Sequence, residues 1–501
     1  MRFLSIVFAR IFARFFDRNF TFFNHLKNKR EVVAWSFYDF ANQPFTTIII
    51  TFLFAPYFAD VICSTLDPGD GMALWSLGIS ITAIFVAFIS PIIGAISDTG
   101  GFRKFFFVLS TWTCIITTAC LFFFKQGDVY SALVYVIIAN IGFELGSVIC
   151  NSYLPEIADK KNIGKISGFA WGLGFLGGLI SLVMLFSLMI LLPMILVNVI
   201  DLELKIVRVS TIIVAIWFAV FSIPAFFLVR EKSSEKLTKK HINQSFYSIR
   251  NTFYEIKKYK KIVRFLIARI FYNDALITIF ALGAIYAVIT LDFSLTETLI
   301  LGIVLNVFAC LGSFFFGKIE DQYGPKWCIE VSIITLFFAL VLAFIAPFFN
   351  MLIGKSIFWF SGILIGIMTG PSQSCSRSLM ARLTPEEKTN EFFGFYAFTG
   401  KATAFLGPFL FYLIWNILSS FLSCQSDGLK ICFKFLEEKL AHPWCTPYII
   451  NPQKQEYICN YILSYNLDPN TLAIQLALLV LPLFFLIGYI LFKPLKINTN
   501  E

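Results

Sequence analysis

The chain has 501 residues, of which 58% are hydrophobic and 14% are charged. Soluble domains carry about 25% charged residues, so this composition excludes a water-soluble globular protein and indicates a polytopic membrane protein. The net charge is +9. Because Lys and Arg concentrate in the segments expected on the cytoplasmic side, membrane topology explains this charge and no nucleic-acid partner is predicted.

The basic N-terminal segment, residues 1–31, precedes the first apolar span. Arg10, Arg14 and Arg18 recur every four residues. They form one basic helical face opposite a Phe-rich surface, as in a helix that lies on the inner leaflet. The alternative is a dispensable extension. The arginines interrupt the apolar run and no small-residue cleavage site follows, so a signal peptide is not predicted.

About twelve apolar segments follow, each long enough to cross the ~30 Å hydrocarbon core as a helix. Every backbone N–H and C=O in lipid needs an internal partner, so each segment is predicted to be helical. The segments are 32–59, 73–97, 105–124, 129–150, 166–192, 206–229, 262–290, 298–317, 327–349, 357–379, 392–422 and 472–492. The predicted fold class is therefore an all-α membrane protein with twelve transmembrane helices.

A basic cytoplasmic linker divides these spans into two six-helix halves. The expected parts are the N-terminal half 32–229, the linker 230–261, the C-terminal half 262–492 with a long outer loop 423–471, and the tail 493–501. The asymmetry of Lys and Arg between the loops predicts that both termini are cytoplasmic.

The first span contains polar residues within an apolar run, in the sequence SFYDFANQPF. Asn42 and Gln43 precede Pro44, which removes a backbone donor and breaks the helix. We predict that Asn42 and Gln43 face a cavity and contact substrate.

Two short motifs recur at equivalent places in the two halves. The pattern G-x3-D-x2-G occurs in GAISDTGGFRK and again, 223 residues later, in GKIEDQYGPK. The pattern G-F-x4-G occurs in GFAWGLG and, 226 residues later, in GFYAFTG. Two matches at nearly one offset indicate an internal duplication.

The inner-loop motif has a physical rationale. A Gly one turn before the helix end lets a neighbouring helix approach closely, and the Asp can accept hydrogen bonds from an adjacent helix N-terminus. The alternative is an ordinary tight inner turn. The candidate residues are Gly94, Asp98, Gly101, Arg103, Lys104, Gly317, Asp321 and Gly324.

Charged residues inside the spans are candidate functional residues. An ionisable group at the centre of a membrane helix costs roughly 2.5–3.5 kcal/mol on insertion scales, so it normally faces a cavity or a partner. The residues of this kind are Asp39, Glu144, Arg269, Asp274, Arg377 and Lys401.

These charges divide by expected depth. Asp274 and Lys401, near the midplane, are predicted to line the substrate site. The other four are predicted to act as gate or coupling residues. The alternative is a set of static ion pairs that hold the two halves together.

The tenth span contains GPSQS, residues 370–374. Gly370-Pro371 is expected to loosen the helix so that freed carbonyls face a cavity. Gln373 and Ser374 can then hydrogen-bond a polar solute. The alternative is a kink that serves packing.

Other chemistry is not indicated. No His/Cys cluster in the spans has metal-ligand spacing, no nucleophile–base pair is evident and no Walker-type loop is present. We predict no enzyme activity, no metal and no cofactor. Disulfides are plausible in the outer loop 423–471 if that side is oxidising; the candidates are Cys424, Cys432, Cys445 and Cys459.

The spans and the repeated loop together resemble the major facilitator superfamily. Within it, SFYDFANQPF, NSYLPEIADKKNIGKISGFAWGLGFLGG, GPSQSCSRSLMARL and EFFGFYAFTGKATAFLGP are similar to the branch of vacuolar amino-acid effluxers and their bacterial relatives. Thr99 and Gln322 stand where that family often has a basic residue.

The resemblance implies a permease that works by alternating access, with spans one, four, seven and ten around a central cavity. Amino acids, exported, are the implied substrates. Proton-coupled import of another small metabolite and a non-transporting receptor or scaffold are the alternatives. The expected partners are a small-molecule substrate and the lipid bilayer, with protons added in the proton-coupled alternative; the coupling ion is left open. The chain is expected to act as a monomer in the cell (inner) membrane.

Overall fold

The structure is a computed structural model. It describes residues 28–65, 70–100, 102–159, 161–195, 202–230, 256–293, 295–401 and 475–495, together with the single positions 247, 251, 410, 413 and 414. All regular secondary structure in these ranges is helical. The all-helical prediction is therefore confirmed for the part of the chain that is described.

The first helix group comprises the described helices before residue 230. Its elements are α2 (Lys29–Pro44), the π-helical η2 (Phe45–Phe52), α3 (Phe54–Tyr57), the π-helical η3 (Phe58–Ile62), α4 (Asp70–Gly100), α5 (Arg103–Cys120), η4 (Leu121–Phe123), α6 (Val129–Ser152), α7 (Leu154–Ile157), α8 (Ile163–Ile195) and α9 (Leu202–Leu228).

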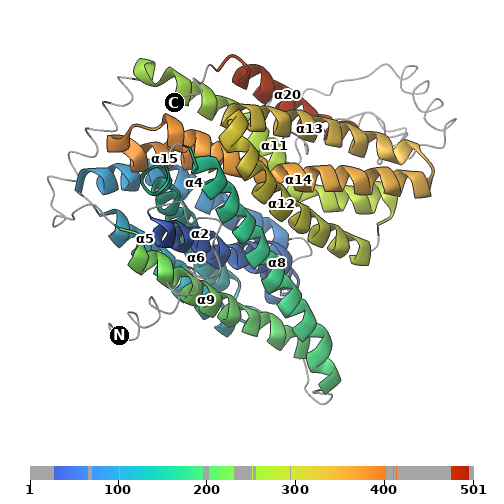
Figure 1. The fold of residues 1–501 in the computed structure, drawn as a ribbon. Helices are drawn as coiled ribbons and strands as arrows, with labels where there is room; N and C mark the ends of the chain where they lie inside the picture. The colour runs from blue at the N-terminus through green and yellow to red at the C-terminus, as the bar shows by residue number, and fades with distance from the viewer. Residues whose placement is uncertain are drawn as a thin grey trace, which may run out of the picture.

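The second helix group comprises the described helices after residue 255. Its elements are η5 (Ile256–Tyr259), α11 (Lys260–Leu291), α12 (Leu295–Tyr323), α13 (Pro325–Ile345), η6 (Ala346–Phe348), α14 (Met351–Leu383), η7 (Glu386–Lys388), α15 (Thr389–Lys401) and α20 (Val480–Phe492). Figure 1 shows the blue-to-green helices of the first group on one side of the molecule and the yellow-to-red helices of the second group on the other.

Nine helices in the described ranges are long and apolar enough to cross a membrane. The first, seventh and eleventh expected spans are not among them. The first is divided into α2, η2, α3 and η3, and the seventh lies in the long helix α11. The eleventh is described as a regular helix only over α15, which is too short to cross alone. A multi-pass membrane protein is confirmed, while the division into twelve spans and two halves of six stays a prediction.

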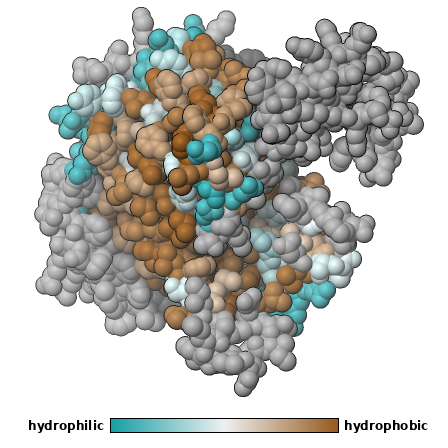
Figure 2. Space-filling view, turned by 90° about the vertical axis from the view of Figure 1, so that its right-hand side faces the viewer, coloured by the Kyte–Doolittle hydropathy of each residue, from teal (hydrophilic) through white to brown (hydrophobic). Residues whose placement is uncertain are grey.

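The outer surface of the bundle is apolar, as a lipid-facing surface must be. Phe88 is 66% exposed and Leu352 is 80% exposed. Figure 2 shows hydrophobic residues over much of one face, with hydrophilic residues toward its top and lower right and in a smaller group near the middle. Lipid rather than water therefore suits the middle of this surface.

The break predicted in the first span is present. Pro44 ends α2, and the chain continues as the π-helix η2. Two threonine hydroxyls satisfy carbonyls along this stretch: Thr46 Oγ1 donates to the Gln43 carbonyl and Thr51 Oγ1 to the Thr46 carbonyl, each at 2.9 Å. Such local substitutes are what allow a proline inside a membrane helix.

The two helix groups meet along two helix pairs, α4 with α15 and α8 with α12. Glycines allow both approaches. A Cβ at Gly394 would lie 2.5 Å from Pro91 Cα, and a Cβ at Gly168 would lie 2.6 Å from Gly317 Cα. The backbones touch at distances that only glycine permits.

Candidate functional site

Arg377 on α14 is the most connected charge in the described part of the bundle. Its side chain is 2% exposed. Nη1 donates to Asp39 Oδ2 at 2.7 Å and to Asn151 Oδ1 at 3.0 Å. Nε donates to Ser167 Oγ at 3.0 Å, and Nη2 donates to the Ser167 carbonyl at 2.8 Å. One guanidinium of the second group thus binds α2, α6 and α8 of the first group.

Two indole rings complete the surroundings of this cation. The Arg377 guanidinium carbon lies 4.8 Å from the ring centre of Trp35 and 5.5 Å from that of Trp171. The Trp35 ring is held in place by its Nε1, which donates to the Cys150 carbonyl at 2.7 Å. Aromatic faces stabilise a desolvated cation. The two indole rings therefore offset part of the cost of burying the Arg377 charge.

Arg377 and Asn151 occupy matching positions of the two groups. They are 226 residues apart, the offset of the repeated G-F-x4-G motif. The residues that follow them differ: Ser152 Oγ donates to Asn390 Oδ1 across the boundary between the groups, whereas Ser378 Oγ bonds Glu320 Oε1 within the second group.

The first junction joins the loop aspartate of α4 to the start of α15. Asp98 Oδ1 accepts from the Asn390 backbone N–H at 3.1 Å, and Oδ2 accepts from the Glu391 N–H at 2.8 Å. The Asn390 amide also donates to Asp98. Arg103 lies 3.9 Å from Asp98 and 3.1 Å from Glu156.

The second junction repeats this contact with the roles of the groups exchanged. Asp321 on α12 accepts from the backbone N–H groups of Gly164 at 3.0 Å and Lys165 at 2.9 Å, at the start of α8. Arg382 Nη2 of α14 lies 3.2 Å from Asp321 Oδ1 and 3.9 Å from Glu320 Oε1. A carboxylate at a helix N-terminus satisfies orphan N–H groups and complements the helix dipole.

These contacts close one end of the bundle, which we call the motif end and define by Asp98 and Asp321. Both loop aspartates bind a helix of the opposite group. The glycine of each motif lies at the same contact, because a Cβ at Gly94 would lie 2.3 Å from the Asn390 carbonyl oxygen. The remaining motif residues are peripheral to it: Gly324 has a φ of +86° and begins the turn into α13, while Gly101 lies outside the described residues.

The residues predicted to bind substrate are placed as follows. Asp274 on α11 is 1% exposed, and Asn42 on α2 is 5% exposed. Gln373 Nε2 donates to Asn273 Oδ1 at 3.1 Å, which joins α14 to α11. The side chain of Lys401 lies outside the described residues, so its relation to Asp274 stays a prediction.

Two further predicted substrate residues, Gln43 and Ser374, lie beside α8. A Cβ at Gly178 would lie 3.1 Å from Gln43 Cγ, so Gln43 packs against α8. The Ser374 carbonyl accepts from Ser167 Oγ at 2.7 Å, which places Ser374 beside the partners of Arg377.

The expectation for Gly370-Pro371 needs correction. Helix α14 continues through both residues to Leu383 without a break. A Cβ at Gly370 would lie 2.4 Å from the Ala309 carbonyl oxygen of α12. The glycine is required by close packing, which was the alternative interpretation.

Two of the predicted gate residues do not bridge the groups through Arg377. Arg269 Nη1 donates to the Tyr396 carbonyl at 2.9 Å, and its guanidinium lies 3.6 Å from the Tyr396 ring centre. This contact joins α11 to α15 within the second group. Glu144 is half-buried on α6 and is not among the hydrogen-bond partners of Arg377.

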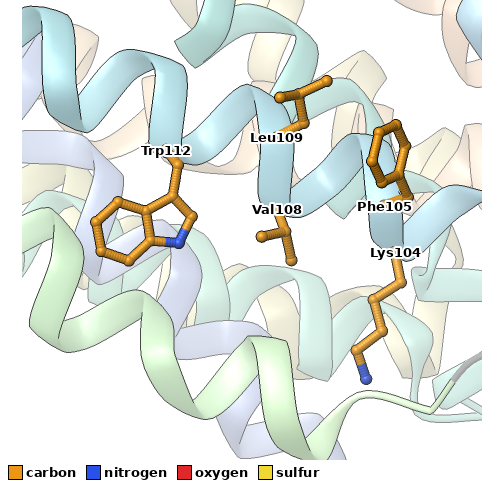
Figure 3. Close-up of a pocket in the computed structure, with 5 residues that line it drawn as sticks. All are labelled: Lys104, Phe105, Val108, Leu109 and Trp112. Atoms are coloured by element: carbon orange, nitrogen blue, oxygen red, sulfur yellow. The ribbon is translucent and has the colours of Figure 1, made fainter. Parts of the chain in front are cut away.

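A pocket of about 490 Å³ lies elsewhere, on the outer face of α5. Figure 3 shows its lining residues, Lys104, Phe105, Val108, Leu109 and Trp112. Lys104 Nζ donates to the Val229 carbonyl at 3.0 Å, just after α9. Phe105 and Leu109 are at least half exposed, so this is a groove in the lipid-facing surface and contains no predicted substrate residue.

The predicted disulfide cysteines, Cys424, Cys432, Cys445 and Cys459, lie outside the described residues. The sequence did not single out Asn151, Ser167, Trp35, Asn390 or Glu320. A usable signal existed for Asn151, because it precedes Arg377 by the repeat offset.

Comparisons with known proteins agree with this architecture. Residues 71–422 match the family model described as vacuole effluxer Atg22 like. The chain is 27% identical over 379 residues to the uncharacterized MFS-type transporter YxiO of Bacillus subtilis (strain 168), a match that covers 75% of this chain and 86% of that protein. It is 24% identical over 322 residues to autophagy-related protein 22 of Kluyveromyces lactis, covering 58% of this chain and 62% of that protein. The match thus spans less than two thirds of that fungal relative.

Solved structures with the same fold include a bacterial homologue of the iron transporter ferroportin in an outward-facing state. Its TM-score is 0.61 at 12% identity, covering 93% of this chain and 98% of that chain. The Escherichia coli fucose:proton symporter FucP has a TM-score of 0.59 at 13% identity, covering 94% and 98%. At these identities the likeness establishes the major facilitator fold alone.

Proposed function

Because the chain belongs to the vacuole effluxer Atg22-like family of membrane transporters, we propose that it is a permease that moves a small polar solute by alternating access. The observation that carries this proposal is the set of bonds from Arg377 to Asp39, Asn151 and Ser167, which joins the two helix groups at one end of the bundle. A transporter needs such a contact to be strong enough to close the path and weak enough to break.

The gate is made of separable parts. Arg377 supplies an ion pair and hydrogen bonds, and each loop aspartate adds a helix cap on the opposite group. All of them run between helices rather than along one helix, so a rocking motion of one group breaks them together. We assign the motif end to the cytoplasmic side, since Lys and Arg concentrate there.

The substrate site is proposed to lie between the groups, away from the motif end. Asn42, Gln43, Gln373 and Ser374 supply hydrogen bonds, while Asp274 and Lys401 supply one charge of each sign. A zwitterion such as an amino acid requires that combination, because its carboxylate seeks a cation and its ammonium group an anion. Export of amino acids is the direction that the family description, vacuole effluxer, favours.

The test is counterflow in proteoliposomes that contain the purified full-length chain. Liposomes preloaded with one unlabelled amino acid are diluted into trace labelled amino acid, across a panel of the common ones. Transient accumulation above protein-free liposomes supports the proposal. The absence of counterflow for every amino acid would overturn the substrate class, and its absence for sugars and organic anions as well would favour a non-transporting receptor.

A further inference from the structure

Glu320 is a buried carboxylate that the gate described above does not use. It precedes Asp321 on α12 and is 0% exposed. Its carboxyl group lies against the start of α8, because a Cβ at Gly164 would be 2.5 Å from Glu320 Cδ and 2.8 Å from Oε2. It therefore sits on the surface that parts when the two groups separate.

The hydrogen bonding around Glu320 fits a neutral acid. Its Oε1 bonds Ser378 Oγ, and the same hydroxyl lies 3.0 Å from the Cys375 carbonyl. A serine hydroxyl carries one hydrogen. Ser378 Oγ is placed to donate to Glu320 Oε1 and to the Cys375 carbonyl, and its single hydrogen cannot serve both bonds fully. A proton on Glu320 allows both bonds to form. No donor among the described residues reaches Glu320 Oε2, whereas buried carboxylates normally collect several.

The local charge count points the same way. Arg382 is 3.2 Å from Asp321 and 3.9 Å from Glu320. Asp321 also holds two backbone N–H groups of α8, so it is the better-stabilised anion. Arg382 lies nearer to Asp321 than to Glu320, so Glu320 is the less compensated acid, and a buried carboxyl group in that position favours its protonated form.

The other titratable groups around Glu320 come from four helices. They are Asp321 and Lys318 on α12, Lys165 on α8, Cys328 on α13, and Cys375 and Arg382 on α14. Lys165 and Arg382 both neighbour Asp321. This arrangement leaves Glu320 the less compensated of the two acids.

We propose that Glu320 carries a proton while the motif end is closed and releases it when α8 separates from α12. On opening, the O–H bond of the carboxyl group breaks, its electron pair stays on the carboxylate, and the proton passes to water. Closing reverses the step. Each opening of this gate is then linked to one proton, which deepens the proposed alternating-access function and rests on it.

At the first junction the buried acid is Glu391, at the start of α15, which is 1% exposed. Ser97 occupies the position that corresponds to Glu320, and its hydroxyl donates to the Ile93 carbonyl at 2.8 Å within α4. The proton link proposed for Glu320 concerns the junction between α12 and α8, where the buried acid directly precedes the motif aspartate.

Hydrogen–deuterium exchange of the full-length chain in lipid nanodiscs tests this without any substrate. Exchange is followed from pH 5.5 to 8.5, after correction for intrinsic amide rates, in peptides that cover the start of α8 and the end of α12. We expect protection of the Gly164 and Lys165 amides to fall as pH rises, by up to about tenfold per pH unit within the titration window. Protonation of Asp98 or Asp321 would act with the opposite sign, weakening the caps as pH falls.

Substitutions assign the effect to Glu320. Glu320→Gln should hold high protection at every pH, and Glu320→Asp should retain a pH dependence. The matched control is Glu330→Gln, which removes an acid that pairs with Lys326 at 3.4 Å on partly exposed α13 and should leave the wild-type profile unchanged. Ser378→Ala removes the acceptor of the Glu320 proton and should move the transition to lower pH.

A wild-type profile that does not change with pH would overturn the inference, as would an unchanged profile in Glu320→Gln. If Glu320→Gln does not fold, Ser378→Ala decides the question. An exchange transition at the same pH in Ser378→Ala as in wild type would then overturn the inference. Since no solute is present, a failed counterflow experiment leaves this result standing, and successful counterflow with a flat exchange profile refutes the proton link alone.

Discussion

The two junctions at the motif end have the same backbone plan and different side chains. In both, an aspartate at the end of one helix accepts two N–H groups at the start of a helix from the other group. The first junction is completed by Asn390, by the buried Glu391, and by the buried Arg103 in its pair with the partly exposed Glu156. The second is completed by Arg382 and the buried Glu320.

The difference shows which part of a repeated contact the fold requires. Capping a helix N-terminus depends only on a carboxylate at the right distance, so both copies keep the aspartate and the glycine that permits the approach. The charges around the cap have no fixed geometry to satisfy. They have diverged: the pair of Arg103 with Glu156 lies beside the first cap, and Glu320, which directly precedes the motif aspartate, lies beside the second.

The largest effect is expected from Arg377, which lies between the two junctions. Arg377→Ala removes the buried partner of Asp39, whose side chain is 15% exposed, and breaking a fully buried pair costs about 3–5 kcal/mol, an upper bound here. We expect counterflow to fall at least about 100-fold, with Arg377→Lys in between because it keeps the charge but not the planar fork.

Lys355→Ala is the control for that measurement. Lys355 pairs with Glu297 at 2.9 Å, but both side chains are partly exposed, so counterflow should stay within about twofold of wild type. Wild-type counterflow in Arg377→Ala would contradict the gate assignment.

A side chain at the glycine contacts should hold the motif end open. In Gly168→Val the new Cβ meets the Ser313 carbonyl oxygen at 2.5 Å, and in Gly394→Val it meets Pro91 Cα at 2.5 Å. Overpacking of this kind costs about 1–3 kcal/mol. Amide exchange at the starts of α8 and α15 should rise in each variant.

Gly283→Ala is the matched control for the glycine contacts, because the nearest atom to its Cβ is 4.0 Å away. Its exchange should equal that of wild type. If amide exchange in the two valine variants equals that of wild type, the glycine contacts at Gly168 and Gly394 are not part of the interface that opens.

The aspartate caps separate the junctions from each other. Asp98→Asn and Asp321→Asn each weaken one cap, worth about 1 kcal/mol, so local amide exchange should rise about fivefold. Asp98→Asn should affect the start of α15, and Asp321→Asn the start of α8. Equal loosening of both sites by either variant would show that the junctions open as one unit.

The smallest effect is expected at the partly exposed pair. Glu156→Gln removes a partner of Arg103 at 3.1 Å, and pairs of this kind contribute up to about 1 kcal/mol. Exchange at the start of α15 should change less than it does in Asp98→Asn. A larger change would mean that Arg103 supports the cap through Glu156.

The sequence predicted the helical class, the family and the repeated aspartates, because apolar runs and motif spacing are local properties of the chain. It also marked Asp39 and Arg377, since a charge in an apolar span is conspicuous. It could not pair them, and it could not show that Asp98 caps α15 or that Asp321 caps α8. Those contacts join residues about 150 to 340 positions apart, and only tertiary packing selects them.

Glu320 escaped notice for a different reason. It lies at the end of a span, where a glutamate beside an aspartate usually faces water. Its burial depends on Gly164 of another helix, which hydropathy does not report. The comparison of aligned repeats would have marked the position, since Ser97 stands there in the first copy.

The reciprocal form of the two junctions also bears on ancestry. Each helix group contributes a loop aspartate and also a helix N-terminus that the other group's aspartate caps. The same two surfaces therefore meet twice with their roles exchanged, as in an isologous two-fold dimer. A half-length ancestor with one copy of each patch could have satisfied both only by pairing with itself. On this view the present gate is the former subunit interface of a homodimer, fused into one chain and then free to differ on its two sides.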